Sequence, residues 1–175
     1  KQMAAFDFNE ENPYNRISDY YAVINNCNYY LANADTNFVR LGKKIFEKEY
    51  AAVKTYRAWT YLQLAKVYGQ VPLVTEPVLT EMQAEQEMNK TRSDITAICN
   101  YFINDLQRYV DTEIPQYGEV GSFNSKFFFI PVRVLLGEMC LWAGRYQEAA
   151  TYFSQYLNKK NAPVITRTSG VRWSV

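Results

Sequence analysis

The segment from Glu49 to Leu73 constrains the fold of this chain more than any other part of the sequence. It lies in a helical pattern in which apolar residues recur every three or four positions. The predicted buried stripe consists of Phe46, Tyr50, Val53, Ala58, Trp59, Leu62, Ala65 and Tyr68. Gly69 can end this helix because glycine adopts positive φ without strain, and Pro72 keeps it from resuming because proline has no N–H. The sequence therefore predicts a long helix with an abrupt end and an extended exit.

The same periodicity predicts helices along most of the chain. They cover residues 14–32, 40–68, 95–110, 126–143 and 146–158, with one short helix in the 80–88 run. The helix that ends at Val110 follows the N-cap candidates in Thr91–Asp94. Residues 127–130 have β propensity, but they run into the 126–143 pattern, so we predict helix there and no strand.

Residues 141–150 resemble the interhelix turn of a tetratricopeptide repeat. Gly144 lies at the turn, Tyr146 follows two positions later, and Ala149 three further on. The small Ala149 would let the helices approach closely, while Tyr146 would fill the gap beside the turn. We therefore expect an all-α fold, with tetratricopeptide-like antiparallel helical hairpins stacked into a right-handed array and with long irregular loops. Residues 1–175 are expected to form a single α-helical domain.

Charge and hydropathy exclude two large classes of function. The formal net charge is +1, and Lys and Arg are scattered among Asp and Glu. Such a chain lacks the basic field of a nucleic-acid-binding protein, so no nucleic-acid partner is expected. No stretch approaches the roughly 18 consecutive apolar residues of a membrane-spanning helix, so no membrane span is expected.

The catalytic and metal-binding residue types are scarce. The chain has no histidine, which removes Ser-His-Asp catalysis and His-based zinc sites. Cys27, Cys99 and Cys140 are far apart in apolar helical patterns, which is typical of small buried side chains rather than disulfides or metal ligands. The glycines form no phosphate-binding loop. We expect no catalytic residues, no metal and no cofactor. A histidine-free hydrolase would need two carboxylates about 5–10 Å apart in a cleft.

Two loops offer aromatic and amide groups to a ligand. Asn37 and Phe38 are adjacent in the first, and Tyr117 lies in the second, at 115–123. An asparagine amide both donates and accepts hydrogen bonds, which suits vicinal sugar hydroxyls, and an aromatic ring can stack on a sugar. These three residues are the predicted ligand-binding residues. The alternative is that they are ordinary turn residues and a loop anchor. Residues 75–88 form another candidate surface, for a protein contact.

Several motifs together resemble the SusD/RagB-like family. They are Ile24-x-x-x-Asn28, the acidic Glu49, Arg57-Ala-Trp-x-Tyr61-x-x-Leu64, Tyr68-Gly-x-Val-Pro-Leu73, Arg92-Ser-Asp94, Ile103-Asn-Asp-Leu106 and the 135–149 helices. They occur in the family's order and span most of the chain. Family members are commonly much longer, so the resemblance identifies this chain as a fragment of a larger SusD-like protein, and it carries over no individual binding residue.

The resemblance implies a function without covalent chemistry. Proteins of this family are surface lipoproteins of Bacteroidetes that capture oligosaccharides or other nutrients for a TonB-dependent, SusC-like transporter. It therefore implies a bacterial outer-membrane location on the cell-surface side, an oligosaccharide ligand, and a lipid anchor on the full-length protein. The alternative is a helical-repeat scaffold that binds other proteins and no glycan.

Overall fold

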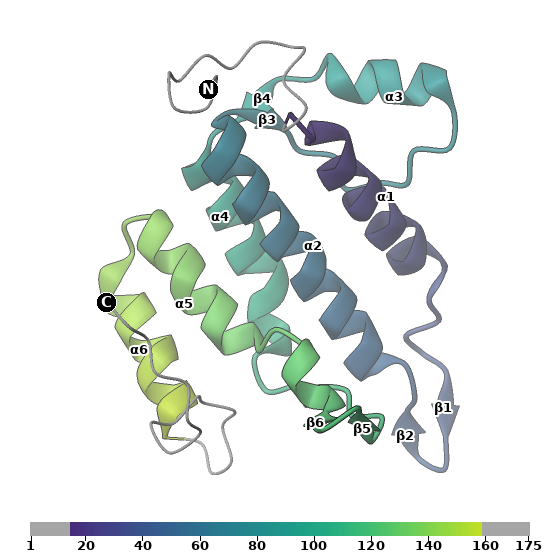
Figure 1. Ribbon diagram of the computed structural model, residues 1–175, viewed down its shortest axis with the longest axis vertical. Coiled ribbons are helices and arrows are strands. Elements are labelled where there is room, and N and C mark those ends of the chain that lie inside the picture. The colour runs from purple at the N-terminus through teal and green to yellow at the C-terminus, as the bar shows by residue number, and fades with distance from the viewer. Residues whose placement is uncertain (1–14, 159–175) are drawn as a thin grey trace.

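Six α-helices make up most of residues 15–158, the part of the chain that the computed structural model describes (Figure 1). They are α1 (Ile17–Asn33), α2 (Glu47–Tyr68), α3 (Glu81–Met88), α4 (Ile95–Leu106), α5 (Val132–Trp142) and α6 (Tyr146–Leu157). Two short 3₁₀ helices are η2 (Gln107–Tyr109) and η3 (Ser125–Phe128). Three antiparallel strand pairs complete the structure: β1 (Val39–Arg40) with β2 (Lys43–Lys44), β3 (Val71–Pro72) with β4 (Arg92–Ser93), and β5 (Glu119–Val120) with β6 (Phe123–Asn124).

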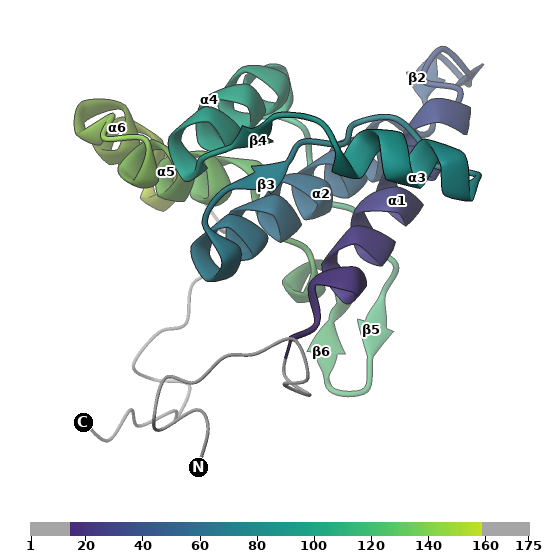
Figure 2. The same ribbon diagram turned by 90° about the horizontal axis from the view of Figure 1, so that it is seen from above.

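The long helices form an array in which neighbours run in opposite directions. Helix α1 packs on α2, α2 on α4, α4 on α5, and α5 on α6 (Figure 1). Helix α3 stands outside the array, beside α1 (Figure 2). The predicted all-α fold of antiparallel helical hairpins with irregular loops is confirmed. Residues 127–130 form no strand, as predicted, and the strands found within residues 15–158 are the three two-residue pairs.

Helix α2 is central, and its burial differs from the predicted stripe. It packs against α1, α4 and α5, so residues on several of its faces are covered. Tyr61 is completely buried, whereas Trp59, which belongs to the predicted stripe, is 40% exposed. The buried part of α2 also contains four polar residues that the apolar periodicity does not include. They are Lys54, Thr55, Arg57 and Thr60.

The predicted helix ends are largely confirmed. Gly69 directly follows α2, Gly144 lies two residues after the end of α5, and both have φ of +74°. The Asp94 carboxylate accepts a hydrogen bond from the N–H of Ala97 at 2.8 Å, which caps the start of α4. These positions were readable from sequence because they depend on local backbone chemistry.

The predicted start of the second helix at residue 40 was wrong. Strands β1 and β2 occupy that region and pair Val39 with Lys44, and the turn between them has positive φ at Leu41 (51°) and Gly42 (73°). The N–H of Ile45 donates to the carbonyl of Phe38 at 3.2 Å, so the hairpin closes before α2 begins. Apolar residues at 45 and 46 continue the helical spacing by coincidence.

The predicted helix from 126 was also too long. Residues 125–128 form η3, Phe129 is extended, and α5 begins only after Pro131. Proline disfavours helix at the residue before it, so Ile130 cannot join η3 to α5. The backbone carbonyl of Phe128 instead accepts a hydrogen bond from the hydroxyl of Tyr56 on α2.

Helices α5 and α6 pack tightly at Gly137. A Cβ atom placed there would lie 2.7 Å from ring atoms of Phe153. Leu136-Gly137 and Ala149-x₃-Phe153 match the Leu-Gly and Ala-x₃-Phe elements of the tetratricopeptide pattern. Ala149 is fully buried as predicted, but Tyr146 is 69% exposed and does not fill the gap. Gly137 and Phe153 determine the packing instead.

Candidate functional site

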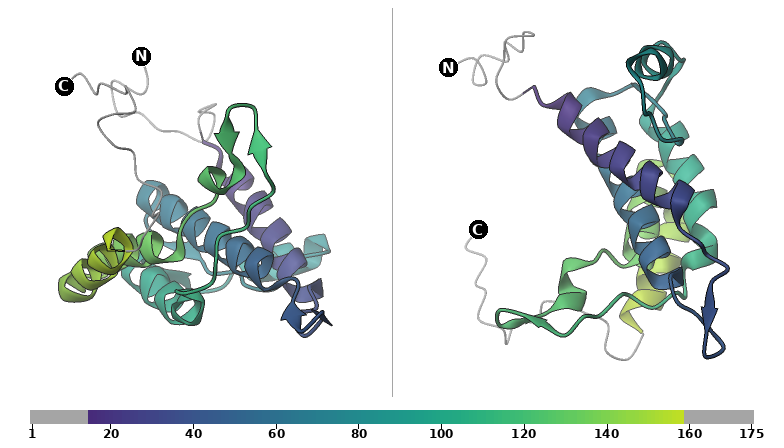
Figure 3. Two further views of the ribbon diagram at one scale, coloured as in Figure 1. Left: turned by 90° about the horizontal axis from the view of Figure 1, so that it is seen from below. Right: turned by 90° about the vertical axis from the view of Figure 1, so that its right-hand side faces the viewer.

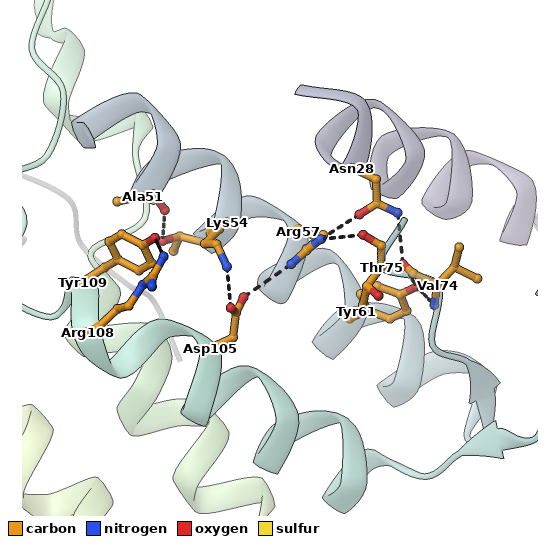
Figure 4. Close-up of polar contacts among 11 residues, drawn as sticks. Asn28, Ala51, Lys54, Arg57, Tyr61, Val74, Thr75, Asp105, Arg108 and Tyr109 are labelled. Atoms are coloured by element: carbon orange, nitrogen blue, oxygen red, sulfur yellow. Dashed lines mark hydrogen bonds and ion pairs between the residues drawn. The ribbon is translucent and has the colours of Figure 1, made fainter. Parts of the chain in front are cut away.

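The signature residues of α1, α2 and α4 meet in one buried polar cluster (Figure 4). Arg57 is at its centre and only 5% exposed. Its Nη1 donates to Oδ1 of Asn28 at 2.9 Å and to the carbonyl of Thr75 at 3.2 Å. Its Nη2 reaches Oδ2 of Asp105 at 3.4 Å. Lys54 forms an ion pair with the other oxygen of the same carboxylate.

The cluster also fixes residues 69–80, the connecting segment between α2 and α3. Nδ2 of Asn28 donates to the carbonyls of Val74 and Glu76, at 3.1 and 3.0 Å. The hydroxyl of Tyr61 donates to the carbonyl of Val74 at 2.9 Å and accepts from its N–H at 2.7 Å. Asn25 forms a similar pair of bonds with the backbone of Val78. The motif residues thus bind the backbone of the connecting segment and have a structural role.

Charge is unevenly balanced in the cluster. Two cations, Lys54 and Arg57, share the carboxylate of Asp105. Burial lowers the pKa of Lys54, and the hydrogen bond to Asp105 opposes this effect. The Lys54 ammonium also lies 5.7 Å from the ring centroids of both Tyr50 and Tyr109. Lys54 therefore connects the cluster to the aromatic pair of Tyr50 and Tyr109.

Two polar hollows open beside this cluster and share Tyr50. The larger, here the Asn37 hollow, has a volume of about 370 Å³ and is lined by Thr36, Asn37, Lys44, Glu47, Tyr50, Arg108 and Tyr109. The smaller, here the Tyr101 hollow, has a volume of about 230 Å³ and is lined by Asn28, Leu31, Ala32, Tyr50, Lys54, Arg57, Thr75, Glu76, Tyr101 and Asp105. Amide, hydroxyl and charged groups around aromatic rings can hold the hydroxyls of a small polar ligand.

The structure places Asn37 on the wall of the larger hollow, and Phe38 beside it. The N–H of Asn37 donates to Oδ1 of Asp35 at 2.9 Å, which forms a tight turn at the end of α1. Phe38 is half exposed, and its ring packs against that of Phe46 with centroids 5.8 Å apart. Phe38 thus anchors the hairpin that carries the hollow and does not itself line it.

Tyr117 lies elsewhere. Its hydroxyl donates to Oε1 of Glu49 at 2.6 Å, and its ring centroid is 6.2 Å from that of Phe129. Burial and the Glu49 carboxylate raise the pKa of Tyr117 to about 12. The β1–β2 and β5–β6 hairpins stand on opposite sides of α2 (Figures 2 and 3), so Asn37 and Tyr117 do not share one site.

Sequence reasoning missed Lys44, Arg108 and Tyr109 as residues of the larger hollow. Arg108 and Tyr109 follow α4, about 70 positions after Asn37, and only the packing of α4 against α2 brings them there. One signal was available, because Arg40, Lys43 and Lys44 surround Gly42 in a run of basic residues.

A third hollow is apolar and lies between α1, α3 and the connecting segment. It has a volume of about 250 Å³. Its lining residues are Ser18, Tyr21, Ala22, Ile24, Asn25, Asn28, Val74, Val78, Ala84 and Met88. It overlaps the 75–88 surface that the sequence marked for a protein contact.

Residues 15–158 contain neither a metal site nor a membrane-spanning helix. No group of three or more acidic or cysteine side chains there has the arrangement of a metal site. None of the helices described has the length and apolarity needed to cross a bilayer. The three cysteines are buried and free, which confirms their predicted packing role.

The fold occurs in solved structures, although comparison of sequences alone finds no related protein. No protein-family profile matches the chain, and no curated protein does. A solved SusD-like carbohydrate-binding protein from Bacteroides fragilis superposes with a TM-score of 0.66 at 22% identity, over 86% of this chain and 28% of that one. A second SusD-like protein from the same species superposes with a TM-score of 0.61 at 22% sequence identity, over 81% of this chain and 26% of that one. The chain thus has the fold of a helical part of SusD-like proteins and spans about a quarter of their length.

Proposed function

We propose that this chain is the helical part of a non-catalytic SusD-like glycan-binding protein of the bacterial outer surface. It would capture oligosaccharides and deliver them to a TonB-dependent, SusC-like transporter, with a lipid anchor on the full-length protein. The observation that carries the proposal is the fold, shared over most of the chain with a SusD-like carbohydrate-binding protein. The order of the motifs at Asn28, Arg57 and Asp105 supports it independently.

The Asn37 hollow is the proposed ligand site. It combines the amide of Asn37, the hydroxyl of Thr36 and two tyrosine side chains. Its walls come from the α1–α2 connection and the end of α4, and loops on a rigid helical scaffold commonly carry binding residues. Phe38 would hold the loop in place for binding. Tyr117, which is 64% exposed, is a separate candidate contact on the other side of α2.

A glycan array probed with the 175-residue chain tests this function. We expect at least one oligosaccharide class to bind. In a calorimetric titration with that glycan, Asn37→Ala should lower the affinity about tenfold, which corresponds to the loss of roughly one to two hydrogen bonds. Asn158→Ala is the matched control, because Asn158 is an exposed amide on the distant α6 helix. A blank array, together with no co-purifying outer-membrane transporter, would refute the proposal.

The apolar hollow between α1 and α3 favours a second candidate function, a helical scaffold that binds proteins. Its lining includes Tyr21, Val78 and Met88, and apolar grooves of this kind suit peptide side chains. This candidate predicts peptide binding that is blocked by Ala84→Arg and indifferent to sugars. Glycan binding that Asn37→Ala weakens and Ala84→Arg leaves intact would decide for the first function.

A further inference from the structure

The Asn37 hollow is rich in positive charge. Lys44 and Arg108 line it, and Glu47 is its one acidic lining residue among those described. Just outside, the hairpin register places Arg40 directly opposite Lys43. The chain as a whole carries a net charge of only +1, so this concentration of cations is a local feature.

Arg108 contacts an aromatic ring directly, whereas Asp105 attracts it without forming an ion pair within residues 15–158. Its guanidinium carbon lies 4.6 Å from the ring centroid of Tyr109. Within residues 15–158 its side-chain hydrogen bond goes to the hydroxyl of that same tyrosine. The guanidinium is therefore oriented, and it retains N–H groups for a ligand. An arginine in this state suits a planar anionic group, which it can bind through two parallel hydrogen bonds.

The aromatic rings of the hollow are poorly placed for stacking on a neutral sugar. Tyr109 is only 6% exposed, and Tyr50 is half-buried against it, with centroids 6.1 Å apart. The Lys54 ammonium approaches both rings from within. A ligand therefore meets little free ring surface, and the amide and the cationic groups are its main partners.

The pairing of Arg40 with Lys43 adds an electrostatic reason. Like charges directly opposite each other in an antiparallel pair repel and destabilise it. Lys44 follows immediately on the same strand and therefore points to the opposite face from Lys43, toward the hollow that it lines. The three cations together give the hairpin a positive local potential, which favours a negatively charged ligand over a neutral one.

We propose that the Asn37 hollow binds a saccharide that carries a carboxylate or sulfate group. Arg108 and Lys44 bind the anionic group, and the amide of Asn37 binds a neighbouring hydroxyl. The inference rests on the proposed glycan-binding function and adds the chemical class of the ligand. Its hallmark is an affinity that falls steeply with added salt, because the attraction is between solvent-accessible charges.

Calorimetric titrations with two matched pairs of saccharides test the inference. The first pair is trigalacturonate and its neutral methyl ester, and the second is lactose that carries one sulfate ester and unmodified, neutral lactose. We expect the charged member of at least one pair to bind about tenfold more tightly at low salt. Lys44→Gln and Arg108→Gln should each remove most of this difference. Lys90→Gln, on the exposed face of the opposite end of the molecule, should leave it unchanged.

Each outcome decides the matter. Equal or tighter binding of the neutral members, or folded Lys44→Gln and Arg108→Gln variants that keep full affinity for the charged ones, would overturn the inference and leave glycan binding intact. Binding of neutral glycans on the array but of neither charged probe would do the same. A blank array would overturn the glycan-binding function itself. Circular dichroism checks folding, and Lys44→Gln, on an exposed strand, keeps the test valid if Arg108→Gln unfolds.

Discussion

The guanidinium of Arg57 donates a hydrogen bond to the amide oxygen of Asn28 at 2.9 Å, which joins α2 to α1 across 29 positions of the sequence. The same asparagine uses its NH₂ group to bind two carbonyls of the connecting segment. Each polar group of the Asn28 amide is thus satisfied, and three parts of the chain depend on one side chain.

Asn28→Ala should therefore destabilise the fold markedly. The substitution leaves Arg57 and the carbonyls of Val74 and Glu76 without their partner, and we expect a loss of about 3 kcal/mol in the free energy of unfolding. Urea denaturation followed by circular dichroism measures it. The control is Asn33→Ala, whose exposed amide binds only within its own helix, and which should cost less than about 0.5 kcal/mol. Equal losses in the two variants would contradict the role of Asn28.

Asp105→Asn tests the balance of charge in the cluster. The change keeps the shape of the side chain but leaves Lys54 and Arg57, both nearly buried, without an anion. We expect a loss of about 3 kcal/mol, since breaking a buried ion pair leaves an uncompensated charge. Glu113→Gln breaks an exposed pair with Lys48 and should cost far less, because water already solvates both charges. If Asp105→Asn were as mild as this control, the cluster would not need its carboxylate.

Gly137→Ala should destabilise the α5–α6 hairpin, although alanine favours helices. Alanine in place of glycine within a helix normally stabilises by up to about 1 kcal/mol. Here the added methyl group would lie 2.7 Å from the Phe153 ring, and overpacking costs about 1–3 kcal/mol. The expected sign is therefore a net loss in thermal stability. Adding Phe153→Leu should recover part of it, and a stabilised single variant would show that the two helices are free to separate.

Alkaline pH should weaken the fold. Burial raises the pKa of the Cys99 thiol from 9.0 to about 12, and that of Tyr21 from 10.0 to about 12. Between these values the unfolded chain loses protons that the folded chain keeps, so stability is complete below pH 9.0 and falls as pH rises toward 12. Lys54, whose pKa is lowered, acts in the opposite direction but is one group against several.

Urea midpoints at about pH 8, 9.5 and 11 measure this dependence. Cys99→Ala should make the decline between the first two values shallower, because it removes one of the buried thiols that resist ionisation. A midpoint that stays level through this range would contradict the burial of the thiols. As a companion measurement, a thiol reagent should label the cysteines only after unfolding.

Asn37→Ala and Tyr117→Ala should not act on the same short ligand. The β1–β2 and β5–β6 hairpins that follow these residues stand on opposite sides of α2 (Figure 3), and Tyr117 does not line the Asn37 hollow. We therefore expect a disaccharide to contact only one of the two residues. We expect one of the two variants to lower the affinity, and the double variant to have the same affinity as that one. The coupling energy between residues at separate sites should be less than about 0.5 kcal/mol. Strong coupling between them in the titrations would indicate a ligand that reaches around the helix.

The sequence predicted the features that depend on neighbours in the chain. The Asp94 cap and the glycine ends at 69 and 144 follow from local backbone chemistry, and the structure confirms them. It missed the hairpin at 39–44, because Ile45 and Phe46 keep a helical spacing past the positive-φ turn at Gly42. The short strand pairs have too few residues to show an alternating pattern.

The candidate site was only partly predictable, for a different reason. Asn37 was identified because it lies in a polar loop, but Arg108 and Tyr109 meet it only through the packing of α2 and α4. Apolar periodicity likewise cannot predict that Lys54 and Arg57 are buried, since their partner Asp105 is about 50 positions away. Long-range polar pairs leave no periodic trace in a single sequence.

The connecting segment is held by its main chain. Tyr21, Asn25, Asn28, Arg57 and Tyr61 all bind backbone carbonyl or N–H groups of residues 72–78. Because every residue type offers the same carbonyl, the side chains at exposed positions such as Glu76 can be replaced freely. An added or deleted residue would instead shift every bond out of register. The segment thus tolerates substitutions but not insertions or deletions. Its exposed side chains can therefore be changed to create a new surface without destabilising the scaffold.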